Sequence, residues 1–306
     1  MKLRESAKGR IRCGELGENR LINQLTARPK PRADVIAGPG DDCAVVSAPD
    51  DGRLLLLKTD CVVERVHFKP NDKPSSVGWK AMARTLSDFA AMAGLPQFAL
   101  VTLVVSADRE VRWVKEIYRG LHRAADRFGV TVVGGETSRT DGPAIVSVTV
   151  VGNVEEDRWV SRAGGKVGDA LFVTGKLGGS INSKHLNFTP RITEARWLSA
   201  NFSIHAMMDL SDGLGADLPR LAAASGVGFA IEEQALPRTR GCSVDAAIND
   251  GEDYELLFAI SPDDTSALQA KWRRKFSDLA LTRIGVLLPA AGFELPRSFH
   301  GYVHFE

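Results

Sequence analysis

The sequence contains several acidic side chains in positions where they could bind a metal ion or a phosphate. In GPGDD (residues 38–42), a tight turn carries the adjacent carboxylates Asp41 and Asp42 directly ahead of an apolar run. Adjacent carboxylates repel each other unless a cation lies beside them. Further acidic residues lie in or at the ends of other apolar segments: Asp60, Asp88, Glu136, Asp209 and Asp212. Buried carboxylates need cations, and oxygen ligands without clustered His or Cys favour Mg²⁺, so the set predicts a magnesium site that serves phosphates.

Each of these segments also has a purely structural interpretation. GPGDD can be a polar turn with exposed aspartates, and Ser211 or Asp212 can cap a helix, which leaves Asp209 unexplained. The glycines before Glu136 permit close approach of the backbone to a ligand or form a plain turn. Arg162 can hold a phosphate or lie on the surface. The spacing around His67 favours a structural or solvent-exposed histidine over a functional one.

Composition excludes several classes of function. A net charge of +1 over 306 residues gives no electrostatic case for nucleic acid or a membrane surface. The four cysteines form no CxxC pair, which favours a reducing cytoplasm, and the basic N-terminus lacks the apolar core of a signal peptide. No apolar run is long enough to span a bilayer. Walker A, protein-kinase, GxGxxG, HExxH and GxSxG strings are absent from the sequence.

The predicted elements place several of the acidic residues beside apolar surfaces. A buried strand over residues 54–63 places Lys58 and Asp60 on one face, because side chains alternate along a strand. The helix over residues 75–93 is apolar or small nearly all round, so Asp88 within it needs a partner. Further strands are expected at 98–105, 130–133, 144–151, 170–174, 205–210, 227–231, 254–260 and 279–287, and helices at 15–25, 108–128, 190–199, 214–224 and 262–272.

The order of these elements favours an α+β fold. Strands and helices are mixed in both halves without strict βαβ alternation, which argues against a doubly wound sheet. A polar stretch at 155–158 is the expected domain boundary. The predicted division is a basic arm at 1–14, an N-terminal domain at 15–155 and a C-terminal domain at 156–306.

Seven strings in order carry a resemblance to a known family. They are GPGDD (38–42), KTDCVVERVHF (58–68), GWKAMARTLSDFAAMAGLP (78–96), VVGGETSR (132–139), SRAGGKVGDALFVTG (161–175), MDLSDGLGADL (208–218) and DGEDYELLF (250–258). Together they resemble the thiamine-monophosphate kinase family, within the AIR synthetase-like (PurM-like) ATP-binding superfamily. The resemblance runs from about residue 14 to the end of the chain.

The resemblance implies two PurM-like domains, the first forming the core of a homodimer. It implies Mg²⁺-dependent in-line transfer of the ATP γ-phosphoryl group to thiamine monophosphate, giving thiamine diphosphate and ADP. The implied metal-binding residues are Asp41, Asp42, Thr59, Asp60, Asp88, Glu136, Asp209 and Asp212, of which Asp42, Asp88 and Asp212 are the catalytic candidates. The implied nucleotide-binding residues are Gly135, Glu136, Arg162 and Ser211, and those for thiamine are His67, Glu252 and Tyr302.

The chain departs from the family pattern in three places. Glu136 stands where the family usually has Asp, Lys58 replaces a small hydroxyl residue, and the segment from 175 to 190 is short. We expect Lys58 to reach either Asp60 or a phosphate oxygen. The runners-up within the superfamily are an AIR-synthetase-type ligase, a selenophosphate synthetase and a hydrogenase-maturation dehydratase. The shared GGET string keeps the first open, whereas the lack of a glycine-cysteine-lysine string at Cys13 argues against the second and the lack of a cysteine at the end of the sequence argues against the third. A nucleotide-binding regulator without transfer activity is the alternative from another class, and the full acidic set argues against it.

Overall fold

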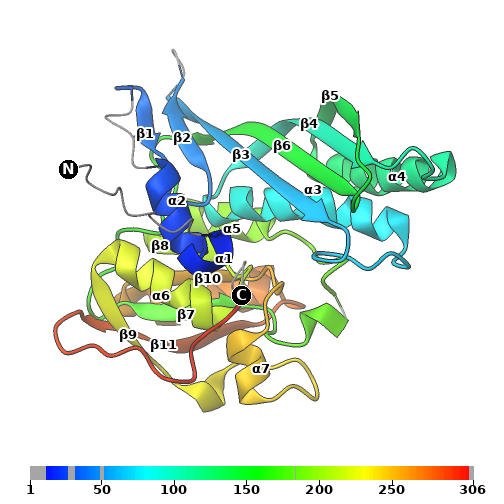
Figure 1. Ribbon diagram of the computed structural model, residues 1–306. Coiled ribbons are helices and arrows are strands. Elements are labelled where there is room, and N and C mark those ends of the chain that lie inside the picture. The colour runs from blue at the N-terminus through cyan, green and yellow to red at the C-terminus, as the bar shows by residue number, and fades with distance from the viewer. Residues whose placement is uncertain (1–11, 27–31, 49–51, 183, 303–306) are drawn as a thin grey trace, which may run out of the picture.

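The computed structural model describes residues 12–26, 32–48, 52–182 and 184–302. It consists of two mixed helix-and-sheet halves, stacked one above the other with helix α3 (Pro74–Ala91) between them (Figure 1). The predicted α+β class is confirmed. Residues 1–11 of the predicted arm lie outside the described residues, and a short helix, α1 (Cys13–Leu16), begins one residue before the predicted end of that arm.

The N-terminal half is built on a six-stranded sheet of order β1-β2-β3-β6-β4-β5. All neighbours are antiparallel except β4 and β5, which are parallel. The strands are β1 (Val35–Ala37), β2 (Ala44–Ser47), β3 (Arg53–Val63), β4 (Leu95–Val105), β5 (Thr131–Arg139) and β6 (Ile145–Glu155). The accompanying helices are α2 (Glu18–Thr26), α3 and α4 (Val111–Phe128).

Strand β3 shows why the two faces of this sheet differ. Leu54, Leu56 and Val62 are buried against α3, and Lys58 and Asp60 share this inner face because side chains alternate. Thr59 therefore lies on the opposite, outer face. The shared face of Lys58 and Asp60 follows from the strand predicted for this segment.

Helix α3 is buried over almost its whole length. Pro74 lacks a backbone N–H, which costs nothing in the first turn of a helix, where N–H groups have no acceptor within the helix. The small residues of α3 let neighbouring elements approach closely. A Cβ added at Gly78 would lie 1.9 Å from the Ile117 carbonyl oxygen of α4, and one at Gly120 would lie 2.0 Å from the Ser75 carbonyl oxygen of α3. These two glycines set the close α3–α4 packing.

The C-terminal half is built on an antiparallel sheet of order β8-β10-β7-β11-β9. The strands are β7 (Ala170–Thr174), β8 (Ile204–Asp209), β9 (Val227–Ile231), β10 (Leu256–Ile260) and β11 (Leu281–Pro289). The helices are α5 (Ile192–Asn201), α6 (Leu214–Ser225), α7 (Val244–Asn249) and α8 (Thr265–Lys275), with 3-10 turns η1 (Ser180–Asn182), η2 (Glu233–Ala235) and η3 (Pro262–Asp264).

One apolar cluster joins the two halves, since it contains β3 and α3 residues together with Phe258 and Trp272 of the second half. Strand β5 is longer than the sequence predicts. The glycines at 134 and 135 do not end it, because they pair with Leu100 and Val101 of β4 after a register shift that leaves Val133 out of the pairing. Within the described residues, no helix combines the length and the apolar character that crossing a bilayer requires.

Candidate active site

Three buried carboxylates from distant parts of the chain meet between the two halves. Asp42 follows the turn after β1, Asp88 lies on α3, and Asp209 ends β8. One oxygen from each lies within 4.8 Å of the others. Ser87 donates a hydrogen bond of 2.5 Å to the Asp209 carboxylate. The predicted convergence of Asp42, Asp88 and Asp209 is therefore present in the fold.

The electrostatics of this cluster favour a bound cation. Burial raises the pKa of Asp88 well above its usual value, and repulsion from Asp60 and Asp209 adds to the shift. Burial and repulsion from Asp42 raise the pKa of Asp209 to about 7. Buried carboxylates that repel one another are stabilised by a divalent ion, and Mg²⁺ prefers oxygen ligands. The residues present therefore fit a magnesium site.

Two basic side chains already neutralise part of the cluster. Arg162 donates to both oxygens of Asp42, at 3.1 Å from Nε and 2.6 Å from a terminal nitrogen. Lys58 Nζ donates to Asp88 Oδ1 at 2.8 Å. The ion pair of Lys58 is thus formed with Asp88 rather than Asp60, although Lys58 and Arg84 together hold the pKa of Asp60 below its usual value against the opposing effect of burial.

A cleft of about 630 Å³ opens beside these carboxylates. Helix α2 contributes one edge and α6 another, and Figure 1 shows α1 and α2 in front of the junction of the two halves, next to α6. The predicted site residues that line it are Asp41, Asp60, Asp88, Arg162, Asp209, Ser211 and Asp212. Asp212 accepts a 2.5 Å hydrogen bond from Arg220, and Asp41 accepts one of 2.6 Å from Ser161.

A smaller pocket adjoins this cleft and contains the three residues predicted for thiamine. His67, Glu252 and Tyr302 line it, although they come from the first half, the segment before β10 and the C-terminal tail. The two cavities share four lining residues: Arg84, Ser211, Asp212 and Tyr254. A ligand in the cleft and a ligand in the pocket would therefore meet at a common wall.

Glu252 is held in place by a buried lysine. Lys80 Nζ, whose side chain is fully buried, donates to Glu252 Oε2 and, at 2.7 Å, to the His67 carbonyl oxygen. His185 Nδ1 lies 3.0 Å from both Lys80 Nζ and Glu252 Oε2. Although burial opposes its ionisation, the contacts with His185 and Lys80 lower the pKa of Glu252 to about 2. Burial lowers the pKa of Lys80 to about 8, so the pair remains charged at neutral pH.

The backbone that carries Glu252 is strained. Glu252 and Tyr254 have φ angles of +68° and +50°, a region that side-chain-bearing residues rarely adopt. Their N–H groups donate to the Ser211 and Leu210 carbonyl oxygens at 2.7 and 2.8 Å, which holds the segment against the end of β8. Such strain costs about 1–3 kcal/mol per residue and clusters at binding sites.

Three predicted residues lie outside the cleft. Thr59 is on the outer face of the sheet, where Thr149 donates to its hydroxyl at 2.9 Å. Glu136 is exposed and pairs with Thr102, three strand spacings or about 14 Å across the sheet from β3. A Cβ at Gly135 would lie 1.8 Å from the Val101 carbonyl oxygen, so its close approach is to β4. Their assignment to metal or nucleotide stays a prediction.

The residues that sequence reasoning missed at these cavities include the charged or aromatic side chains of Lys80, Arg84, Arg220 and Tyr254. A signal for two of them was present. Lys80 and Arg84 lie four residues apart on the same apolar helix as Asp88, and the argument that a buried carboxylate needs a partner applies equally to buried cations.

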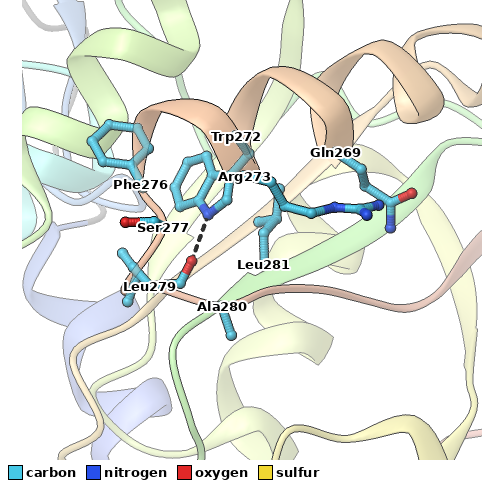
Figure 2. Close-up of a pocket in the computed structure, with 8 residues that line it drawn as sticks. All are labelled: Gln269, Trp272, Arg273, Phe276, Ser277, Leu279, Ala280 and Leu281. Carbon is cyan, nitrogen blue, oxygen red and sulfur yellow. Dashed lines mark hydrogen bonds between the residues drawn. The ribbon is translucent and has the colours of Figure 1, made fainter.

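A further hollow lies between α8 and β11, and Figure 2 shows its lining residues. Trp272 forms part of its wall, and the indole N–H donates to the Leu279 carbonyl oxygen at 2.8 Å. Arg273 is its charged lining residue, and none of the predicted site residues contributes to it. This hollow is therefore separate from the two cavities that the predicted acidic residues line.

Comparison with known proteins identifies the family of this chain. Models of the AIR synthase related protein family match residues 40–154 (N-terminal domain) and 166–289 (C-terminal domain). The thiamine-monophosphate kinase of Rhodopirellula baltica is 35% identical over 94% of this chain and 98% of its own length. That of Bacillus subtilis is 31% identical with the same coverage. This chain belongs to the thiamine-monophosphate kinase family.

A solved structure supports membership of the thiamine-monophosphate kinase family at the level of the fold. AaThiL complexed with AMPPCP and TMP has a TM-score of 0.81 and 32% identity, covering 96% of this chain and 99% of that one. The predicted family, the two-domain PurM-like fold and the class of ATP-dependent phosphotransferase are confirmed.

Proposed function

We propose that this protein transfers the γ-phosphoryl group of ATP to thiamine monophosphate, giving thiamine diphosphate and ADP, with Mg²⁺ as the metal. The observation that carries the proposal is the wall shared by the two cavities. A carboxylate-rich cleft suited to metal and nucleotide phosphates lies on one side, and a pocket containing an ionised glutamate lies on the other. In-line transfer needs two ligands that face each other across such a junction.

The cleft would bind the nucleotide phosphates. Asp42, Asp88 and Asp209 are proposed to hold Mg²⁺, which when bound neutralises the charge of the triphosphate. Asp41, Asp60 and Asp212 line the same cleft and are proposed as further ligands. Arg162 orients Asp42 through its bidentate contact and adds a fixed positive charge.

The pocket would bind the thiamine part of the acceptor. The thiazolium ring of thiamine carries a permanent positive charge, which the ionised Glu252 complements. Tyr254 stacks on Phe188 at a centroid distance of 3.8 Å, so an aromatic wall stands beside that charge. We propose that His67 and Tyr302 complete the contact with the rings.

We also propose a homodimer formed through the outer face of the N-terminal sheet. Leu57, Phe98 and Leu100 expose 37%, 49% and 47% of their surface there, which favours burial by a second copy. That copy would also enclose Thr59 and Glu136, which a single chain leaves outside the cleft. Phe98→Glu and Leu100→Glu should shift the mass measured by light scattering from dimer to monomer. A monomeric unmodified protein would contradict the dimer.

A coupled ADP-release assay tests the proposed function. Thiamine monophosphate should support ADP release, whereas thiamine, aminoimidazole precursors and selenide should not. ATP hydrolysis or binding without transfer to any acceptor would instead indicate a nucleotide-binding regulator. The reaction needs ATP, which the cytoplasm supplies, so we also propose that the enzyme is cytoplasmic.

A further inference from the structure

Arg84 occupies the wall between the cleft and the pocket. It projects from α3 one turn before Asp88 and one turn after Lys80, so the three charged side chains lie on one stripe of the helix. Arg84 lines both cavities, and its side chain is 14% exposed. It is thus a nearly buried cation at the place where two bound ligands would meet.

The hydrogen-bonding capacity of Arg84 is only partly used. One terminal nitrogen donates to the Cys61 carbonyl oxygen at 3.2 Å, and the other lies 3.9 Å from Asp60 Oδ1, too far for a hydrogen bond. Its Nε is buried and has no acceptor among the described residues. A buried N–H left without an acceptor destabilises a structure, so it marks a place where a ligand atom belongs.

A purely structural role explains these contacts less well. A guanidinium that exists to neutralise a carboxylate usually forms two short parallel bonds, as Arg162 does with Asp42. Arg84 instead faces acidic groups on both sides, Asp60 toward the cleft and Glu252 toward the pocket, without a short bond to either. Its donors remain available for an anion placed between the two cavities.

We propose that Arg84 binds the phosphate group of the acceptor substrate and holds it in line with the terminal phosphate of the nucleotide. This inference rests on the proposed function and adds the residue that reads the acceptor's phosphate. An oxygen of that phosphate forms the new bond to the γ-phosphorus, the bond from the γ-phosphorus to the bridging oxygen breaks, and ADP leaves with the electron pair. No proton has to be removed from an ionised acceptor phosphate.

The physical reason for a guanidinium here is the repulsion between two anions. Transfer requires the acceptor phosphate to approach a triphosphate, and a fixed positive charge between them lowers that repulsion. Arginine keeps its charge at every relevant pH and presents a fork that matches phosphate oxygens. The same side chain would disfavour acceptors that lack a phosphate, since its buried donors would stay unpaired.

The test compares thiamine monophosphate with thiamine, which lacks only the phosphate. Calorimetry on the full chain with bound AMPPCP measures both affinities in the unmodified protein, in Arg84→Met and in Arg84→Lys. Arg84→Met should weaken binding of thiamine monophosphate at least tenfold and leave that of thiamine within about twofold. Arg84→Lys keeps the charge but loses the fork, so it should retain part of the phosphate preference.

Matched controls separate this effect from a general loss of structure. Arg109→Met removes another partly buried arginine, which pairs with Glu64 outside both cavities, and it should not change the ratio of the two affinities. The AMPPCP affinity of each Arg84 variant should equal that of the unmodified protein, which shows that the cleft is intact. If Arg84→Met does not fold, the affinity ratio of Arg84→Lys decides.

An unchanged ratio in the folded Arg84 variants would overturn the assignment of Arg84 while leaving the kinase reaction standing. If the unmodified protein binds neither compound and releases no ADP with thiamine monophosphate, the proposed function fails, and the role of Arg84 fails with it. In the kinetic version of the test, KM for thiamine monophosphate should rise while KM for ATP stays constant.

Discussion

The ion pair between Lys80 and Glu252 allows a quantitative prediction. Lys80 is fully buried and contacts Glu252, His185 and the His67 carbonyl oxygen. Lys80→Met keeps much of the side-chain volume but leaves Glu252 with His185 as its remaining side-chain hydrogen-bond partner among the described residues. Removing one partner of a buried pair costs about 3–5 kcal/mol, and because 16% of the Glu252 side chain is exposed we expect the lower end, about 3 kcal/mol. That is a large part of the 5–15 kcal/mol typical of a whole protein.

Urea denaturation of a double-mutant cycle measures this effect. Lys80→Met, Glu252→Gln and the double variant are compared by their free energies of unfolding. The double variant should be less destabilised than the sum of the two single changes by about 1–3 kcal/mol, since neither charge is then left unpaired. Lys115→Met on the exposed side of α4 serves as a control and should change stability by less than about 0.5 kcal/mol. Additive single changes would refute the pairing.

Four further predictions concern packing, pH and the metal cluster. Gly120→Ala should lower the free energy of unfolding by about 3 kcal/mol, the upper end of overpacking, because its Cβ would meet the backbone of α3; an unchanged urea midpoint would contradict this. The folded-state pKa of Glu252 lies at about 2, below its unfolded value of about 4.5. The ionised Glu252 therefore stabilises the folded protein above pH 4.5, and this stabilisation is lost as pH falls toward 2. The melting temperature of Glu252→Gln should accordingly depend less on pH in that window than that of the unmodified protein. Asp212→Asn should reduce turnover at least about a hundredfold without rescue by excess Mg²⁺, while circular dichroism melts change little since the side chain is partly exposed. Lys58→Ser removes the positive charge that lies beside Asp88, so Mn²⁺ should bind at least about tenfold more tightly in the presence of AMPPCP. Titration followed by electron paramagnetic resonance measures this affinity. An unchanged Mn²⁺ affinity would contradict the role of Lys58 as a competing cation.

The secondary structure was largely accessible from local patterns. The strand predicted at 54–63 and the helix predicted at 75–93 match β3 and α3 closely, because alternation and a proline start signal act within a few residues. Strand β5 was predicted too short. The two glycines at 134 and 135 predict the end of a strand. In the structure the strand continues through them, and position 135 has no room for a Cβ because the backbone of β4 lies too close.

Residue types and their order were enough to predict the chemistry of this protein, because they showed hard oxygen ligands in apolar surroundings and a series of motifs that identifies the family. They could not determine which side chains share a space. Thr59 and Asp60 are neighbours in the chain yet lie on opposite faces of the sheet, whereas Asp42, Asp88 and Asp209 meet from three separate elements. The positions of Arg84 and Lys80 at the two cavities were likewise decided by tertiary structure. The physical reason is that long-range packing sets these distances, while residue type and spacing constrain only the local backbone and the kind of ligand that a side chain can bind.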